Sequence, residues 1–180
     1  MFKTLIIITL LTFLIACSSM KEAGVVYHDG FDFSSVKSYS LYDRNSTFTE
    51  AQGLLDTRRN AIEIAIERSM AEQNFNYAEL DETDLIVTYH VVSGSRKDYA
   101  KYNEVVRFCT FCLQATTWKT DQQYSAIRRG SLIVDLVDPK QGRSVWRSVY
   151  SLDLEDRENS AETNDRIKQA ISAMLAKYPR

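Results

Sequence analysis

The first hydrophobic feature of the chain is an apolar run from Leu5 to Ala16, which follows a single cation at Lys3. A cation, a short apolar stretch and a small residue are the features of a secretory signal peptide. The run is shorter than the roughly 18 to 20 residues that a helix needs to cross a bilayer. We therefore expect a cleaved signal rather than a permanent membrane span.

Two later segments carry apolar residues at steps of three and four, the period of an amphipathic helix. Asp56 is expected to be the N-cap of the first helix, because its carboxylate can accept hydrogen bonds from the free amides of the first turn, and the helix is expected to end near Asn74. A capping box formed by Thr47 and Glu50 would give it an earlier start. The second helix precedes Pro179 and has this apolar stripe: Ile167, Ala170, Ile171, Met174, Leu175 and Tyr178.

The remaining apolar pattern predicts strands. Short strands are expected over residues 25–27 and 36–42, and residues 85–92 are apolar almost throughout, which indicates a central strand covered on both faces. Residues 131–137 and 143–152 form a hairpin, because the intervening Asp138-Pro139-Lys140-Gln141-Gly142 supplies turn residues. Between Arg96 and Arg129 the pattern is least regular, and we expect one or two strands within residues 105–118.

The predicted order is strands, helix, strands, helix. Each helix has one apolar stripe and so needs one sheet face. The fold class is therefore α+β, a two-layer domain in which a mixed β-sheet carries two amphipathic helices packed on one face. With 44% hydrophobic residues and only 2 Pro and 6 Gly in 180 residues, the composition is that of a single globular domain, which we place at residues 25–180.

The end of the apolar run carries a more specific motif. Leu14-Ile15-Ala16-Cys17 resembles the lipobox of bacterial lipoproteins. The resemblance implies a signal peptide over residues 1–16, a lipidated tether over residues 17–24, and acyl chains such as palmitate on Cys17 that bind the membrane. An ordinary secretory signal with an incidental cysteine is the alternative. Ser18, rather than Asp, follows the cysteine. By resemblance to Gram-negative lipoproteins, the absence of Asp implies the outer membrane, facing the periplasm, with the periplasmic leaflet of the inner membrane as the alternative.

The charge of the chain is unevenly distributed. The formal net charge is −2, yet residues 93–129 hold seven cations against three anions. This near-neutral total argues against nucleic acid as a partner. A basic segment with interleaved aromatic residues could instead bind another envelope protein or an anionic envelope glycan. Alternatively, the cations are ordinary solvated surface charges, and the aromatic residues form a second layer of the protein's own core. The candidate contact surface consists of Arg96, Lys97, Tyr99, Tyr102, Trp118, Tyr124, Arg128 and Arg129.

Two cysteines remain once Cys17 is assigned to lipid. Cys109 and Cys112 would lie in an oxidising compartment, which favours a disulfide. In an extended strand their Cα atoms would be about 10 Å apart, so the bridge needs a turn or bulge at Thr110-Phe111. Free thiols, a redox-active pair and a metal site are the alternatives. Because the chain has only 2 histidines, no metal or other cofactor is expected.

The candidate catalytic residues are few. Asp135 and Asp138 are three apart in a strand and point to opposite faces, so they cannot form one acid–base pair. We expect Asp138 to cap the hairpin turn and Asp135 to pair across the hairpin with Arg147 if the register allows. His90 is expected to be a hydrogen-bonded, half-buried residue. A small hydrolase or glycan-processing enzyme that uses Asp135 and His90 is the alternative, and it requires both side chains to meet in one cleft.

Trp146 is expected to anchor the core with its indole N–H at the edge. No phosphate loop, dinucleotide fingerprint or zinc-protease motif is present in the sequence. The chain is therefore expected to be a non-enzymatic accessory or binding module of the cell envelope.

Several motifs together resemble the bacterial lipoprotein family described as domain of unknown function 4136. The departures are Ser148, where members often carry Gly, and the cysteine pair. The resemblance implies an envelope-anchored α/β domain and no particular activity. It rests on Asp32-Phe33 before Tyr39, Ala61-Ile62, Asp84-Leu85-Ile86-Val87 with Tyr89-His90, the hairpin residues 130–138, Val145-Trp146-Arg147 and Tyr178-Pro179.

Overall fold

The computed structural model describes residues 23–44, 54–92, 96–109, 115–116, 127, 129–152 and 160–179. The signal peptide, Cys17 and most of the tether lie outside these ranges. Within the described part, no helix is long and apolar enough to cross a membrane. The elements are β1 (Gly24–Tyr27), the 3-10 helix η1 (Phe33–Ser35), β2 (Ser38–Leu41), α3 (Asp56–Glu72), β3 (Asn76–Tyr77), β4 (Leu85–Val91), α4 (Arg96–Val105), β5 (Ala115–Thr116), β6 (Ser131–Asp138), β7 (Arg143–Ser151) and α6 (Ser160–Leu175).

Within the described residues, seven strands form one mixed sheet in the order β3-β2-β4-β6-β7-β1-β5. β2 runs parallel to both β3 and β4, and the other neighbouring pairs are antiparallel. The strands predicted at residues 25–27, 36–42 and 85–92 are therefore confirmed. β4, the apolar run of the sequence, lies inside the sheet between β2 and β6, as its pattern predicted.

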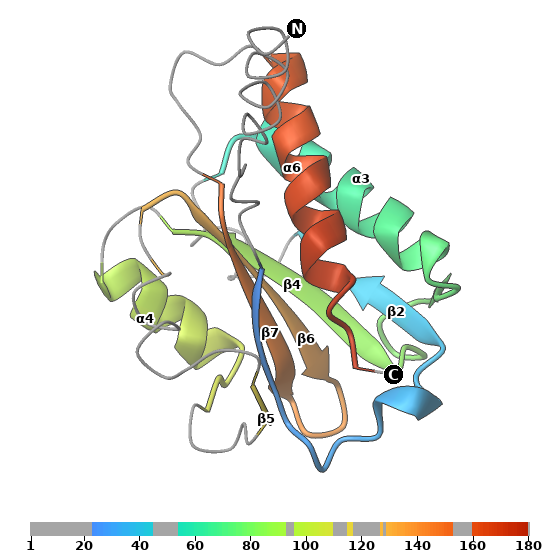
Figure 1. The fold of residues 1–180 in the computed structure, drawn as a ribbon. Helices are drawn as coiled ribbons and strands as arrows, with labels where there is room; N and C mark the ends of the chain where they lie inside the picture. Colours follow the sequence, from blue (N-terminus) through green and yellow to red (C-terminus); the bar gives the residue numbers. More distant parts are fainter. Residues whose placement is uncertain are drawn as a thin grey trace, which may run out of the picture.

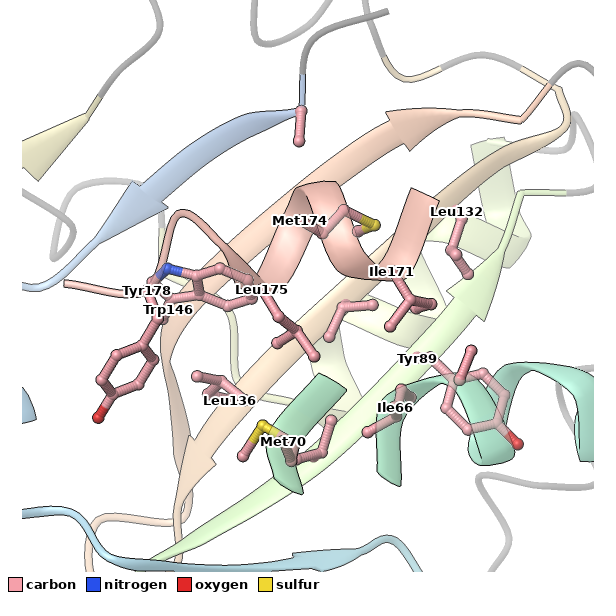
Figure 2. Packing of buried hydrophobic residues seen from close by; sticks show 14 of the residues in the cluster. Ile66, Met70, Tyr89, Leu132, Leu136, Trp146, Ile171, Met174, Leu175 and Tyr178 are labelled. Carbon is pink, nitrogen blue, oxygen red and sulfur yellow. The ribbon is translucent and has the colours of Figure 1, made fainter. Parts of the chain in front are cut away.

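Helices α3 and α6 lie side by side on one face of the sheet (Figure 1). Figure 2 shows how their apolar stripes meet the strands: Met70 of α3 and Leu175 of α6 lie near Leu136, and Ile171 lies near Leu132. Burying such aliphatic side chains stabilises the fold by about 1.5 to 3 kcal/mol each. The predicted α+β class, with two amphipathic helices on one face, is confirmed.

The start of α3 differs from the prediction. Asp56 is the first helical residue, and the N-cap is Leu55, which makes no capping hydrogen bond through its side chain. The rival box at Thr47 and Glu50 lies outside the described residues. The predicted end is confirmed, because Asn74 has a φ of 66° and so takes the left-handed conformation common just after a helix.

The opposite face of the sheet carries α4, where the sequence predicted no helix (Figure 1). Its inward side chains are Tyr102 and the nearby Tyr99 and Val105, which join Val106, Ile133 and Val149 in a second, smaller apolar cluster. Only the short β5 falls inside the interval in which strands were expected. β5 agrees with the prediction of one or two strands there, and residues 110–114 and 117–118 lie outside the described part. The helix itself was missed because its apolar positions are aromatic or β-branched, residue types that are typical of strands.

The hairpin β6–β7 agrees with the sequence. Asp138 accepts hydrogen bonds from the Lys140 backbone N–H at 2.8 Å and from the Gln141 side-chain amide at 2.6 Å, and Gly142 has a φ of 61°. The predicted turn cap is confirmed. The register shifts between Leu136 and Val137, where a β-bulge places Ser144 opposite Val137.

Candidate functional site

A group of buried polar side chains lies between the sheet and α4. At its centre Arg147 of β7 lies directly opposite Asp135 of β6. The Arg147 Nε donates to both carboxylate oxygens of Asp135, at 2.9 and 3.1 Å. Asp135 is 0% and Arg147 1% exposed, so the predicted pair across the hairpin is confirmed and is sealed from solvent.

Two hydroxyl groups complete the environment of the Asp135 carboxylate. Ser144 donates to it at 2.5 Å and Tyr102 at 2.6 Å, and the Tyr102 hydroxyl also lies 3.0 Å from that of Thr88. Burial, and then the charge of Asp135, raises the pKa of Tyr102 well above its ordinary value. The Asp135 carboxylate therefore accepts hydrogen bonds from an arginine and from two hydroxyl groups.

The bulge explains why Ser144 reaches this carboxylate. In an unbroken register, Ser144 would face Asp138 and point to the side covered by α3 and α6. The extra residue moves Ser144 opposite Val137, which lies on the same face as Asp135. The bulge therefore lets the Ser144 hydroxyl donate to the Asp135 carboxylate, which it could not reach in a regular hairpin.

The far side of the Arg147 guanidinium binds α4. Its Nη1 donates to Asn103 Oδ1 at 2.7 Å and to the Tyr99 hydroxyl at 3.2 Å. The guanidinium carbon lies 3.5 Å from the centre of the Phe108 ring, just beyond α4. Burial opposes the charge of Arg147 most strongly, but the Asp135 carboxylate together with Tyr102 and Tyr99 raises the pKa of Arg147 above its ordinary value. One arginine thus links β6, β7, α4 and the segment after it.

His90 belongs to the same face but not to a cleft. Its ring is 1% exposed and stacks on Tyr102, with ring centres 4.7 Å apart and an angle of 14° between the planes. The ring was expected to be half-buried, and it is instead fully buried. The alternative in which Asp135 and His90 meet in an open cleft is contradicted, because the carboxylate has no exposed surface and faces Arg147.

The candidate contact surface is only partly described. Arg129 is exposed and Tyr99 is half-buried, whereas Tyr102 is buried and so cannot contact a partner. Arg96 and Lys97 open α4, and their side chains lie outside the described part, as do the following residues: Trp118, Tyr124 and Arg128. Tyr102 was misplaced because its membership of the core depends on α4, which the sequence pattern did not predict.

The cysteine and tryptophan predictions have mixed outcomes. Cys109 is disulfide-bonded, but Cys112 lies outside the described residues, so their pairing stays a prediction. The described residues contain no group of three His, Cys, Asp or Glu side chains that could hold a metal ion. Trp146 is fully buried in the core, and its indole N–H has no hydrogen-bond partner within the described part, which corrects the expected position at the edge.

Sequence reasoning found the Asp135–Arg147 pair but missed its partners. The sequence did contain a signal for these partners. Thr88 and Ser144 are polar residues within otherwise apolar strands, and Tyr102 lies in an amphipathic segment. Since a buried charge requires several hydrogen-bond partners, an Asp in the middle of a buried strand predicts such residues on neighbouring elements. Their identities depend on α4 and on the bulge.

Comparison with known proteins places this fold in a family. Residues 25–180 match the family model described as "Domain of unknown function (DUF4136)", so the chain belongs to this family. A crystal structure of a DUF4136 family protein from Bacteroides thetaiotaomicron is similar over 88% of this chain and 96% of its own, with a TM-score of 0.58 and 14% identity. At that identity the similarity concerns the fold alone.

Two further solved structures are more distant. A PDZ domain protein from Parabacteroides distasonis matches 91% of this chain and 38% of its own, with a TM-score of 0.47 and 14% identity. A PelC dodecamer from Paraburkholderia phytofirmans matches 89% of this chain and 99% of its own, with a TM-score of 0.40 and 13% identity. No curated protein is significantly similar to the chain.

Proposed function

We propose that this DUF4136 protein is a lipoprotein of the cell envelope that acts as a non-enzymatic accessory or binding module. Acyl chains on Cys17 would anchor it in the outer membrane, facing the periplasm, with the periplasmic leaflet of the inner membrane as the alternative. The support is the lipobox-like sequence that ends at Cys17. Because each buried methylene contributes about 0.8 kcal/mol, several acyl chains together make dissociation negligible.

One observation carries the proposal of binding rather than catalysis. The side chains best suited to acid–base chemistry, Asp135 and His90, are at most 1% exposed. The Asp135 carboxylate is already occupied by donors from three residues. A catalytic group must reach its substrate, and this carboxylate instead holds α4 through Arg147. A partner would therefore meet the outer side of α4 and its flanking cations.

Charge complementarity suggests the class of partner. The segment around α4 is basic in a chain of net charge −2, and its exposed described cations include Lys101, Arg107 and Arg129. Such a surface favours an acidic patch of another envelope protein, or an anionic glycan. The cysteine pair next to α4 would stiffen this surface if Cys109 bonds to Cys112.

The experiment is crosslinking of the full lipidated protein in native envelopes, followed by affinity recovery and mass spectrometry. A variant with Arg96, Lys97, Arg128 and Arg129 changed to Glu should recover at least fivefold less partner, since charge reversal makes an attractive surface repulsive. The matched control reverses two exposed cations elsewhere, Lys37 and Lys168. Equal recovery by the two variants would remove the proposed surface.

The anchor is tested in the same preparation. Cys17→Ala should abolish incorporation of labelled palmitate and move the protein from the membrane to the soluble fraction. Continued membrane attachment of that variant would contradict the lipid anchor. The contact surface would still be tested by how much crosslinked partner the charge-reversal variant recovers.

A further inference from the structure

A cavity of about 410 Å³ lies where the parallel strands β2 and β3 end. Its walls come from residues 40–44, which end and follow β2, from residues 77–80 after β3, and from Glu63 of α3. Residues 40–44 and 77–80 lie at the carboxyl ends of β2 and β3, which run parallel to each other. The volume also falls within the range of small-molecule sites, about 300 to 1,000 Å³.

A prearranged polar network forms one wall of this cavity. Glu63 is 7% exposed, and its carboxylate accepts a hydrogen bond from the Tyr89 hydroxyl at 2.6 Å. Arg44 donates to the same carboxylate through Nε and Nη2, and to Asn60 Oδ1 at 2.8 Å. The charges of Arg44 and Glu63 therefore offset each other, and their contacts fix the geometry of the wall.

The remaining charges of the cavity are negative. Asp43 and Glu79 are exposed residues of its lining, and no cation besides Arg44 belongs to the described lining. Two further exposed acids, Asp81 and Glu82, follow in the loop after β3. Because the carboxylates outnumber the single paired arginine, the cavity attracts a cation and repels an anion.

Two exposed apolar side chains complete the lining. Tyr77 is 57% and Leu80 40% exposed, so both side chains are open to a ligand in the cavity. The Tyr77 ring packs edge-to-face with Tyr39, with ring centres 5.8 Å apart, so its position is fixed. An aromatic face attracts an ammonium group, while Leu80 can cover the methylenes of an alkyl chain.

We propose that this cavity binds a primary ammonium group on an alkyl chain, supplied by a free polyamine or by a lysine side chain. Asp43 and Glu79 would pair with the ammonium, and Tyr77 and Leu80 would contact the chain. The Arg44–Glu63 pair positions the wall without competing for the cation. This site is separate from the basic surface on α4 and does not depend on the membrane anchor.

The test is isothermal titration of the full lipidated protein, in a neutral detergent, with spermidine and with Nα-acetyl-lysine methylamide. The uncharged 1,8-octanediol is the control for the alkyl chain. Wild type should bind at least one of the two amines and not the diol. The double variant Asp43→Asn, Glu79→Gln should weaken amine binding at least tenfold, and Tyr77→Ala should weaken it several-fold.

A matched double variant, Glu72→Gln with Asp165→Asn, removes two exposed acids on α3 and α6, and it should bind like the wild type. Binding of spermidine alone would identify a free polyamine as the source, and binding of the lysine derivative alone a protein side chain. No amine binding at millimolar concentration, or an equal loss in both double variants, would overturn the proposal. The unfolding midpoint of each variant separates loss of binding from loss of fold.

Discussion

At the scale of single residues, Arg147 has the most consequential environment in the described structure. Its buried guanidinium donates through Nε to Asp135 and through Nη1 to Asn103 and Tyr99, and it stacks on Phe108, whereas Nη2 has no partner among the described residues. A buried ion pair of this kind is weak evidence for net stability, because desolvation offsets much of the attraction. Its effect is larger on which arrangement of α4 is allowed, since no other position offers the arginine so many partners.

The first prediction concerns this arginine. Arg147→Met should lower the free energy of unfolding by about 3 to 5 kcal/mol, because it leaves the Asp135 carboxylate buried without its cation. Urea denaturation measures the change. The exposed pair Arg166–Glu162 provides the control, and Arg166→Met should cost less than about 1 kcal/mol. If Arg147→Met were as mild as the control, the cluster would not hold the fold together.

A companion variant separates charge from shape. Replacing both partners, Arg147→Met with Asp135→Leu, removes the unpaired charge and should recover much of the lost stability. Failure to recover would show that the aromatic stacking and the hydroxyl network contribute more than the ion pair itself.

At the scale of elements, the sequence predicted the helices and strands whose local pattern of apolar residues and turn residues is clear. α6 and the β6–β7 hairpin have clear periods and turn residues, and both were predicted within a few residues. α4 was missed because Tyr99, Tyr102 and Val105 are equally compatible with strands, and only packing against Ile133 and Val149 decides in favour of a helix. The Asp135–Arg147 pair followed from hairpin register, whereas its other partners depended on that missed helix.

A second prediction concerns the tie between two elements that are distant in sequence. Asp84, just before β4, accepts hydrogen bonds at 2.9 Å from the backbone N–H groups of Lys37 and Ser38 and from the Ser38 hydroxyl. The bond from Lys37 is the main cause that lowers the pKa of Asp84. A lowered pKa means that this carboxylate stabilises the folded state above about pH 4, the unfolded value, and that its contribution is lost as pH falls through the folded value.

Asp84→Asn should therefore reduce stability at neutral pH and make it less dependent on pH below about 4 than in wild type. Urea midpoints between pH 7 and pH 2.5 measure both effects. Glu72→Gln, on an exposed part of α3, is the control. Parallel pH curves for wild type and Asp84→Asn would show that the carboxylate has no role in joining β2 to β4.

At the scale of the whole molecule, the sheet is assembled from segments far apart in the chain. β1, the first strand, lies between β7 and β5, and its Val25 and Val26 are buried. The core therefore contains residues close to the proposed anchor. This arrangement could not be read from the sequence, because a four-residue strand carries too little pattern to specify which edge it joins.

The final prediction follows from that placement. A chain that begins at Ser18 should unfold cooperatively, whereas one that begins at His28 should not. Deleting β1 removes two buried valines, worth about 1.5 to 3 kcal/mol each, and exposes the edge of β7, against a total stability of about 5 to 15 kcal/mol. Circular dichroism during thermal unfolding distinguishes the two chains. A cooperative transition in the shorter chain would mean that β1 is an accessory strand.

The position of β1 also determines how the domain would respond to mechanical load. Only six residues separate Cys17 from Gly24, so a pull between an anchor at Cys17 and a partner on α4 would reach β1 almost directly. β1 is antiparallel to β7 over four residue pairs, and a force along the strand would load these hydrogen bonds in shear, so that they must break together. A domain held in this way would resist unfolding under such a pull better than one attached through a peripheral helix.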